Sequence, residues 1–141
     1  MFRTLNISAS GLTAERLRMD TISSNIANSD TTRTADGGPY RRKIALFEEH
    51  LRREMDDITG RRRLRSAGVK AVGIVDSGEE MPLVYDPAHP DAGPDGYVVM
   101  PNVNMATELI DLMVSRRSYE ANVTAFNANK SILLKTLEIG R

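Results

Sequence analysis

The residues most capable of chemistry surround the histidine at position 89. His89 stands close to Asp86, Asp91 and Asp95, and a histidine with three carboxylates is a donor set that can hold a divalent ion. The spacing does not match a calcium loop, because the Asp-x-Asp-x-Asp-Gly pattern ending in Glu is absent. Prolines on both sides also restrict how such ligands could converge. We therefore expect a rigid turn with capping aspartates, and a small metal-dependent hydrolase is the alternative interpretation.

Other catalytic and nucleotide-binding patterns are missing. The chain has no Gly-x-x-x-x-Gly-Lys phosphate loop, no Gly-x-Ser-x-Gly elbow and no His-Glu-x-x-His. It also has no cysteine, which excludes disulfides, thiolate zinc sites and a cysteine nucleophile. The basic run Arg61–Arg65 could contact phosphates, but the net charge is zero and no aromatic residues interleave with it. We predict no enzyme, no catalytic residue, no cofactor or metal site and no nucleic-acid partner.

Length and composition indicate one ordinary domain. The 141 residues are 40% hydrophobic and 27% charged, with 19 basic and 19 acidic side chains. No segment has the ~18 to 20 consecutive apolar residues of a membrane span. The first residues also lack the apolar core of a cleavable signal peptide. If the protein leaves the cytoplasm, we expect a dedicated exporter to carry it.

Apolar residues near the C-terminus recur in steps of four and three. The positions in this row are Met105, Leu109, Leu112, Arg116, Tyr119, Val123, Phe126, Lys130, Leu133 and Leu137. This is the rhythm of a coiled-coil seam. Asn104 is a suitable N-cap with Glu108 in the first turn, and Gly140 supplies a stop. The pattern predicts a helix over residues 104–139.

A similar row begins near the N-terminus. Its positions are Leu5, Ala9, Leu12, Arg16, Met19, Ser23 and Ile26. They predict a helix over residues 4–28, weakened slightly by Gly11. The C-terminal helix would be about 54 Å long, whereas a compact chain of this size has a radius of gyration of about 14 Å. A stripe of this length with a shorter partner favours self-assembly, although a monomeric helix hairpin is an alternative.

Asparagine is frequent on these helices, although it is a poor helix former. The clearest cases are Asn25, Asn28, Asn122, Asn127 and Asn129. These side chains either face solvent without a role or form hydrogen bonds that fix the register of packed helices. The sequence leaves both interpretations open.

The middle of the chain has a different character. Residues 29–40 are rich in Thr, Asp and Gly, which predicts an extended loop. Residues 69–76, 83–85 and 97–100 are expected to be strands. Residues 40–65 carry a local net charge of +4, whereas residues 76–95 contain six acids and no Lys or Arg. These oppositely charged stretches either meet across subunits or are two solvated loops.

Several segments resemble one known family. Ser23-Ser24-Asn25-Ile26-Ala27-Asn28 resembles the signature that flagellar rod and hook proteins share. Further matches to the proximal rod proteins of this axial family are the segments 30–34, 37–42, 84–87, 89–91, 95–98, 101–104, 118–124 and 137–140. The resemblance covers nearly the whole chain and is weakest over residues 48–82.

The resemblance implies a subunit of the bacterial flagellar proximal rod, the driveshaft that transmits torque from the rotor to the hook and lines the export channel. It implies partners among copies of this chain and other rod proteins, and passage through the flagellar type III export apparatus without a cleaved signal. The expected location is the periplasmic rod of the basal body, with no membrane insertion. A soluble coiled-coil adaptor that binds one protein partner is the alternative.

We expect an elongated α+β fold in which N- and C-terminal helices pack as an antiparallel coiled-coil core. The expected divisions are a helical core (1–29 and 103–141), an extended arm (30–68) and a small β-rich outer region (69–102). The predicted subunit-packing residues are Leu5, Leu12, Met19, Ile26, Leu109, Leu112, Tyr119, Val123, Phe126, Leu133 and Leu137. The predicted subunit-contact arm contains Asp30, Thr31, Thr32, Arg33, Gly37, Gly38, Pro39 and Tyr40.

Overall fold

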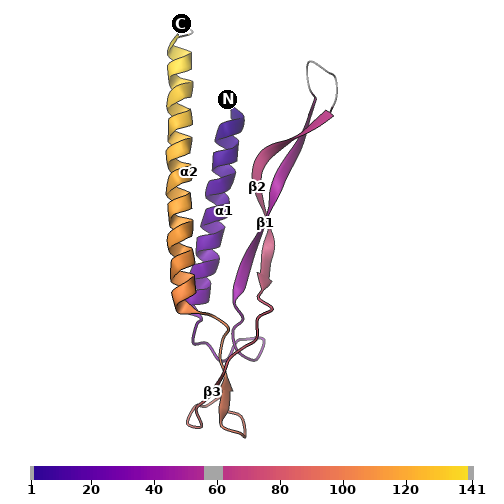
Figure 1. Ribbon diagram of the computed structural model, residues 1–141, viewed down its shortest axis with the longest axis vertical. Helices are drawn as coiled ribbons and strands as arrows, with labels where there is room; N and C mark the ends of the chain where they lie inside the picture. The colour runs from indigo at the N-terminus through magenta and orange to yellow at the C-terminus, as the bar shows by residue number, and fades with distance from the viewer. Residues whose placement is uncertain (1, 56–61, 140–141) are drawn as a thin grey trace. The chain divides into compact units, whose positions relative to one another are not determined.

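The computed structural model describes residues 2–55 and 62–139 and has an α+β fold (Figure 1). Arg61 and Gly140 therefore lie outside the described residues. The elements in chain order are α1 (Phe2–Ala27), β1 (Lys43–Met55), β2 (Arg62–Asp76), β3 (Leu83–Tyr85), β4 (Tyr97–Val99) and α2 (Met105–Ile139). Over the described ranges, neither helix is apolar enough along its length to cross a bilayer.

The two terminal helices pack against one another, as the sequence predicted. The start of α2 follows from Asn104, whose Oδ1 accepts hydrogen bonds from the amides of Ala106 and Thr107 at 3.0 and 3.2 Å. These bonds satisfy two of the amides that a helix start leaves without partners. The predicted cap at Asn104 is thereby confirmed.

Contacts divide the chain into two compact units, and both helices contribute to each. The first unit contains Met1–Leu17, Leu46–Gly73 and Ser115–Arg141, and the second contains Arg18–Ala45 and Ile74–Val114. In the first unit Gly11 lies against Asn122, where an added Cβ would stand 3.0 Å from the amide oxygen. In the second unit Asn25 of α1 bonds to Glu108 of α2. The predicted division into core, arm and outer region stays a prediction.

β1 and β2 form a two-stranded sheet, of which only residues 69–76 were predicted as strand. In the first unit this sheet is attached to α1 through Ser10. The Ser10 hydroxyl accepts a hydrogen bond from the Val69 amide at 3.0 Å and donates one to the Ile7 carbonyl at 2.7 Å. Gly68 has a φ of +112°, and a Cβ there would collide with the Ser10 hydroxyl. Glycine is thus needed where the strand approaches the helix.

β3 and β4 form a second, antiparallel sheet and confirm the two short strands that the sequence predicted. Leu83 pairs with Val99 and Tyr85 with Tyr97, whose rings meet edge to face at 5.2 Å between centroids. Val98 at the centre of β4 is 2% exposed. Among the described residues, the buried apolar side chains are Ala14, Ile22, Tyr40 and Val98. The apolar core of the single chain is therefore small.

Candidate functional site

A buried cluster of polar side chains joins the end of α1 to the start of α2 in the second unit. Its members, hereafter the polar junction, are Asn25, Tyr40, Arg42 and Glu108. Asn25 lies near the C-terminal end of α1, and Glu108 lies in the first turn of α2. Tyr40 and Arg42 belong to the segment that leads into β1. Asn25 is 1% exposed and Glu108 is completely buried.

The Asn25 side chain uses its full hydrogen-bonding capacity. Its amide nitrogen donates to Glu108 Oε2 at 3.0 Å and to the Lys43 carbonyl at 2.9 Å. Its oxygen accepts from the Tyr40 hydroxyl at 3.0 Å and from the Lys43 amide at 2.8 Å. Asn25 therefore fixes the position of three chain segments, which answers the question that the sequence left open for this residue.

The other helical asparagines with described bonds behave differently. The side-chain nitrogens of Asn28, Asn122 and Asn129 each donate to the carbonyl four residues earlier in the chain. Such bonds are local and do not connect the two helices. The register interpretation thus holds for Asn25 and not for these three.

The charged half of the polar junction is the ion pair between Arg42 and Glu108. Arg42 Nε lies 2.6 Å from Glu108 Oε1, and Arg42 Nη2 lies 3.4 Å from Asp111 Oδ2. The hydrogen bond to Glu108, together with the nearby carboxylates, raises the pKa of Arg42 above its ordinary value. The guanidinium therefore stays charged at any physiological pH. Because both charges have partners, the arrangement positions the chain and offers no group for acid or base catalysis.

The backbone of Arg42 extends the same network to the segments that follow β2 and β4. Its amide donates to Asn102 Oδ1 at 2.7 Å, and its carbonyl accepts from the Ser77 amide at 2.7 Å. Asn102 in turn donates to the Glu79 carbonyl at 3.0 Å. A cavity of about 230 Å³ lies beside this network, with Arg42, Glu79, Asn102 and Glu108 among its lining residues. Hydrogen bonds and the ion pair thus connect the start of α2 to the segment before β1, and through it to the segments after β2 and after β4.

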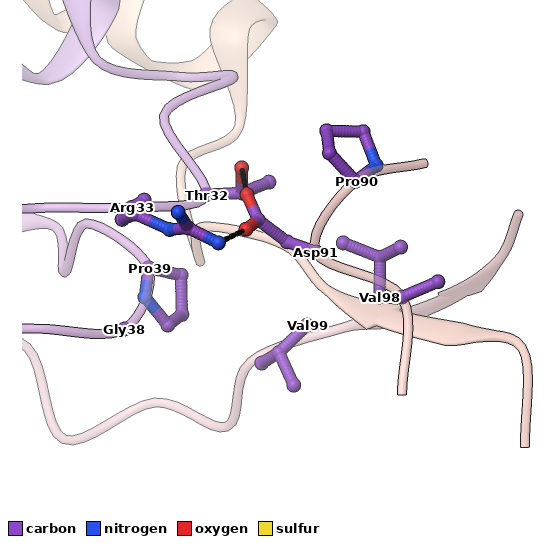
Figure 2. Close-up of a pocket in the computed structure, with 9 residues that line it drawn as sticks. Thr32, Arg33, Gly38, Pro39, Pro90, Asp91, Val98 and Val99 are labelled. Carbon is purple, nitrogen blue, oxygen red and sulfur yellow. Dashed lines mark hydrogen bonds and ion pairs between the residues drawn. The ribbon is translucent and has the colours of Figure 1, made fainter. Parts of the chain in front are cut away.

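The predicted contact arm folds back onto its own chain at Asp91 (Figure 2). The Thr32 hydroxyl donates to Asp91 Oδ2 at 2.8 Å, and the Arg33 guanidinium forms an ion pair with the other oxygen. The Thr32 hydrogen bond and the Arg33 charge lower the pKa of Asp91 below 3.8. Pro39, Pro90 and Val98 line the cavity of about 450 Å³ beside this contact.

The arm residues differ in exposure. Gly37 and Gly38 are exposed with φ values of +85° and +81°, so both adopt a backbone conformation that favours glycine. Asp30 and Arg33 are also exposed, and Thr31, Thr32 and Pro39 are partly buried. Tyr40 is 7% exposed and belongs to the polar junction. The part of the arm open to a neighbour is therefore the segment around Asp30, Arg33, Gly37 and Gly38.

The predicted packing residues are only partly covered within one chain. Leu109 and Leu137 are 43% and 69% exposed. The other nine are partly buried: Leu5, Leu12, Met19, Ile26, Leu112, Tyr119, Val123, Phe126 and Leu133. Further large apolar residues on α2 are exposed, namely Ile110, Met113, Val114, Ile132, Leu134 and Ile139. Arg116, which interrupts the row, pairs with Glu120 on the same helix at 3.0 Å.

The histidine at position 89 lies in a capped turn, as expected. His89 Nδ1 accepts a hydrogen bond from the Asp91 amide at 3.0 Å, and Asp86 Oδ1 accepts one from the Ala88 amide at 3.1 Å. Among the residues that the structure describes, no three His, Asp or Glu side chains converge on a point where a metal ion could bind. The aspartates here shape the loop.

Sequence reasoning missed most of the polar junction. The sequence indicates Glu108 only as an acid in a first helical turn, and it indicates Tyr40 and Arg42 only as part of the arm and of the family resemblance. The signal that pointed to the site was the frequency of asparagine, a poor helix former, on the terminal helices, with Asn25 as one of five cases. Nothing local marked Arg42, which lies 66 residues from Glu108 in the sequence.

Two family models match the ends of the chain. A model described as flagella basal body rod protein matches residues 5–33, and one described as flagellar basal body rod FlgEFG protein C-terminal matches residues 95–139. The chain belongs to the family of flagellar basal-body rod proteins, and it is a structural subunit of the rod.

Full-length relatives place it with the FlgC type within this family. It is 46% identical to the flagellar basal-body rod protein FlgC of Bacillus subtilis, with 99% of this chain and 98% of the relative aligned. It is 39% identical to FlgC of Borreliella burgdorferi, over 99% and 97% of the two chains. It is 36% identical to FlgC of Salmonella typhimurium, over 100% and 98%. A family of structural subunits does not favour the adaptor alternative.

Proposed function

We propose that the chain builds the proximal rod by packing its terminal helices against copies of itself and other rod proteins, and that the resulting shaft transmits torque and lines the export channel. The observation that carries this proposal is the row of large apolar residues that the single chain leaves exposed along α2. Apolar surface of this extent on a helix indicates an interface with other chains.

The energetic argument rests on the same residues. Full burial of a Leu, Ile or Met side chain contributes about 1.5 to 3 kcal/mol, so a residue already half covered can contribute about 1 kcal/mol more. Ile110, Met113 and Leu134 are each more than half exposed. Several such contacts per chain, repeated along a helical array, offset the entropy that association costs.

Apolar packing stabilises the contacts between subunits, and the polar junction fixes how the two helices of one subunit are aligned. The hydrogen bonds from Asn25 to Glu108 and Lys43 hold one end of the helix pair in a single register. A shaft that transmits torque needs subunits of one shape, because a mixture of registers would prevent regular lateral contacts. In this proposal the buried ion pair between Arg42 and Glu108 contributes specificity more than stability.

We further propose that the chain reaches a periplasmic position in the basal body through the flagellar type III apparatus, without a cleaved signal. A narrow export channel passes chains with little stable structure. The small apolar core of the single chain supports this route, because helices that depend on neighbours for burial order on docking. The exposed part of the arm, around Arg33 and Gly37, is proposed to contact neighbouring rod subunits.

The test of assembly uses a strain that lacks its own copy of the gene for this protein. Leu137→Glu places a charge on a residue that is 69% exposed in the single chain, so the isolated protein should keep its helix content. Swimming in soft agar should be lost, because the charge would be buried between subunits. Immunoblots of purified basal bodies should show the variant missing from the rod.

Thr136→Glu is the matched control, since it introduces the same charge at the neighbouring exposed position. It should swim like the wild type. If Leu137→Glu also swims normally and is present in basal bodies, the exposed row on α2 does not mediate assembly and the proposal fails.

A further inference from the structure

The first unit contains a cavity whose charged lining is entirely basic. It encloses about 500 Å³ and is lined by residues of α1, β1 and β2. The basic residues in its lining, hereafter the basic pocket, are Arg3, His50, Arg52 and Arg65. Asn6 and Ser10 add polar groups to the same lining, and no Asp or Glu contributes to it. Nothing in the family assignment gives this pocket a role.

The electrostatics of the basic pocket favour a bound anion. Arg3, His50 and Arg52 form no ion pair with any residue in the described ranges. The first turn of α1 contains no acid that would compensate the positive end of the helix dipole. A concave site lined by charges of one sign concentrates its field and attracts ions of opposite sign. The pocket is thus suited to carboxylates.

The same chain carries the complementary charge elsewhere. Residues 76–95, hereafter the acidic segment, contain six acids and no Lys or Arg. Asp91 is neutralised by Arg33. Glu80 and Asp95, in contrast, are exposed and form no ion pair with any residue that the structure describes. Glu80 and Asp95 therefore carry the charge complementary to that of Arg3 and Arg52.

We infer that the basic pocket of one copy receives the carboxylates of the acidic segment of the next copy. This inference rests on the proposed function and names one contact within it. Because the two surfaces differ, the contact is head to tail, and such contacts build rings or open helical arrays. An open helical array is the arrangement that a rod needs. The charges steer the approaching subunit into one orientation before the apolar seams meet.

Charge reversal tests the pocket, and the neighbouring arginine provides the control. Arg52 lines the pocket, whereas Arg53 follows it in β1 and points to the opposite face of the strand. In the deletion strain, Arg52→Glu should weaken the subunit contact about tenfold, as expected for the loss of a salt bridge at an interface, and should slow swimming expansion. Arg53→Glu should swim normally. Adding Glu80→Arg to Arg52→Glu should restore at least part of the swimming rate.

Cross-linking tests the contact directly, because the chain has no cysteine of its own. Two differently tagged full-length chains, one with Ser66→Cys in the pocket lining and one with Glu80→Cys, are expressed together and basal bodies are oxidised. A disulfide-linked dimer carrying both tags is expected. The pair of Arg53→Cys and Glu80→Cys should give no such dimer.

The outcomes separate this inference from the proposed function. If the wild-type chain restores swimming while Arg52→Glu swims like Arg53→Glu, the inference is wrong and the proposed function stands. If Arg52→Glu stops swimming without rescue by Glu80→Arg and no mixed dimer forms, the pocket binds another anion and the inference is equally overturned. If the wild-type chain neither restores swimming nor enters basal bodies, the proposed function itself fails.

Discussion

Replacing Asn25 with aspartate should destabilise the protein strongly at neutral pH and much less at acidic pH. The substitution keeps the size and shape of the side chain, so it creates no cavity. It places a carboxylate where the amide nitrogen of Asn25 now lies 3.0 Å from Glu108 Oε2. Two unit charges at that separation repel by about 5 kcal/mol at an effective dielectric constant of 20. That energy is comparable with the whole stability of a small domain, about 5 to 15 kcal/mol.

The pH dependence follows from the same repulsion. The folded state raises the pKa of the introduced carboxyl above its ordinary value of about 3.9, because the protonated form can donate to Glu108. The folded state of the variant therefore binds more protons than the unfolded state, and its stability rises as the pH falls toward that ordinary value. Lowering the pH from about 7 to about 5 should recover about half of the lost free energy of unfolding.

Urea unfolding of the full chain, followed by circular dichroism at both pH values, measures these free energies. Amide hydrogen exchange at Lys43 adds a local measurement, since this amide donates to Asn25 Oδ1 at 2.8 Å. Asn28→Asp is the matched control, because Asn28 bonds only locally, to Ser24 and Thr31. It should cost about 1 kcal/mol or less at either pH. Equal losses for Asn25→Asp and Asn28→Asp, or a loss at Asn25 that pH does not change, would refute the reasoning.

Three further predictions concern other parts of the chain. Gly68→Ala should lower the free energy of unfolding by about 2 kcal/mol, measured by urea titration, because φ is +112° and the Ser10 hydroxyl occupies the space. The pKa of Asp91 is lowered in the folded state, so its bonds to Thr32 and Arg33 stabilise the fold above pH 3.8 and lose this effect as the pH falls through the pKa of the folded state. The amide chemical shift of Thr32 should follow this titration in the wild type and should not change with it in Asp91→Asn. Leu112→Ala should cost the isolated chain only about 1 to 2 kcal/mol, since the side chain is partly exposed, and should reduce incorporation into basal bodies more severely.

The helices and short strands were predictable because local rules determine them. The heptad spacing and the Asn104 cap fixed the start of α2 to within one residue, and the structure begins it at Met105. The strands at residues 83–85 and 97–99 are short β-branched and aromatic runs between turn residues. In each case the residues that determine the element lie within or beside it.

β1 was not predicted because its sequence lacks a clear period. The run from Lys43 to Met55 places three charged or polar residues in succession at positions 48–50. Neither strand alternation nor a helical stripe explains that order. The segment is a strand because β2 pairs with it, and pairing with a distant segment is a non-local property that a single sequence does not reveal.

The polar junction was equally hidden, with one exception. Asn25 raised the question of register together with four other helical asparagines, because asparagine forms helices poorly. Its partners could not be named, since Glu108 lies 83 residues away and Tyr40 lies 15 away. The apolar row on α2 was visible in the sequence, but one chain does not indicate which of its members a neighbour covers.

The apolar row stabilises association, whereas the polar junction selects one register of the two helices. The seven-residue repeat in the apolar row explains why both are needed. Apolar residues at seven-residue intervals still meet apolar residues if one helix slides by one heptad, about 10 Å along its axis. Such a slip would separate Glu108 from Asn25 and leave a fully buried carboxylate without its amide donor. Removing one partner of a buried charge costs about 3 to 5 kcal/mol. The contact of Asn25 with Glu108 thus distinguishes one register from the next. The apolar seam can therefore recruit neighbouring subunits without losing the shape that they must share.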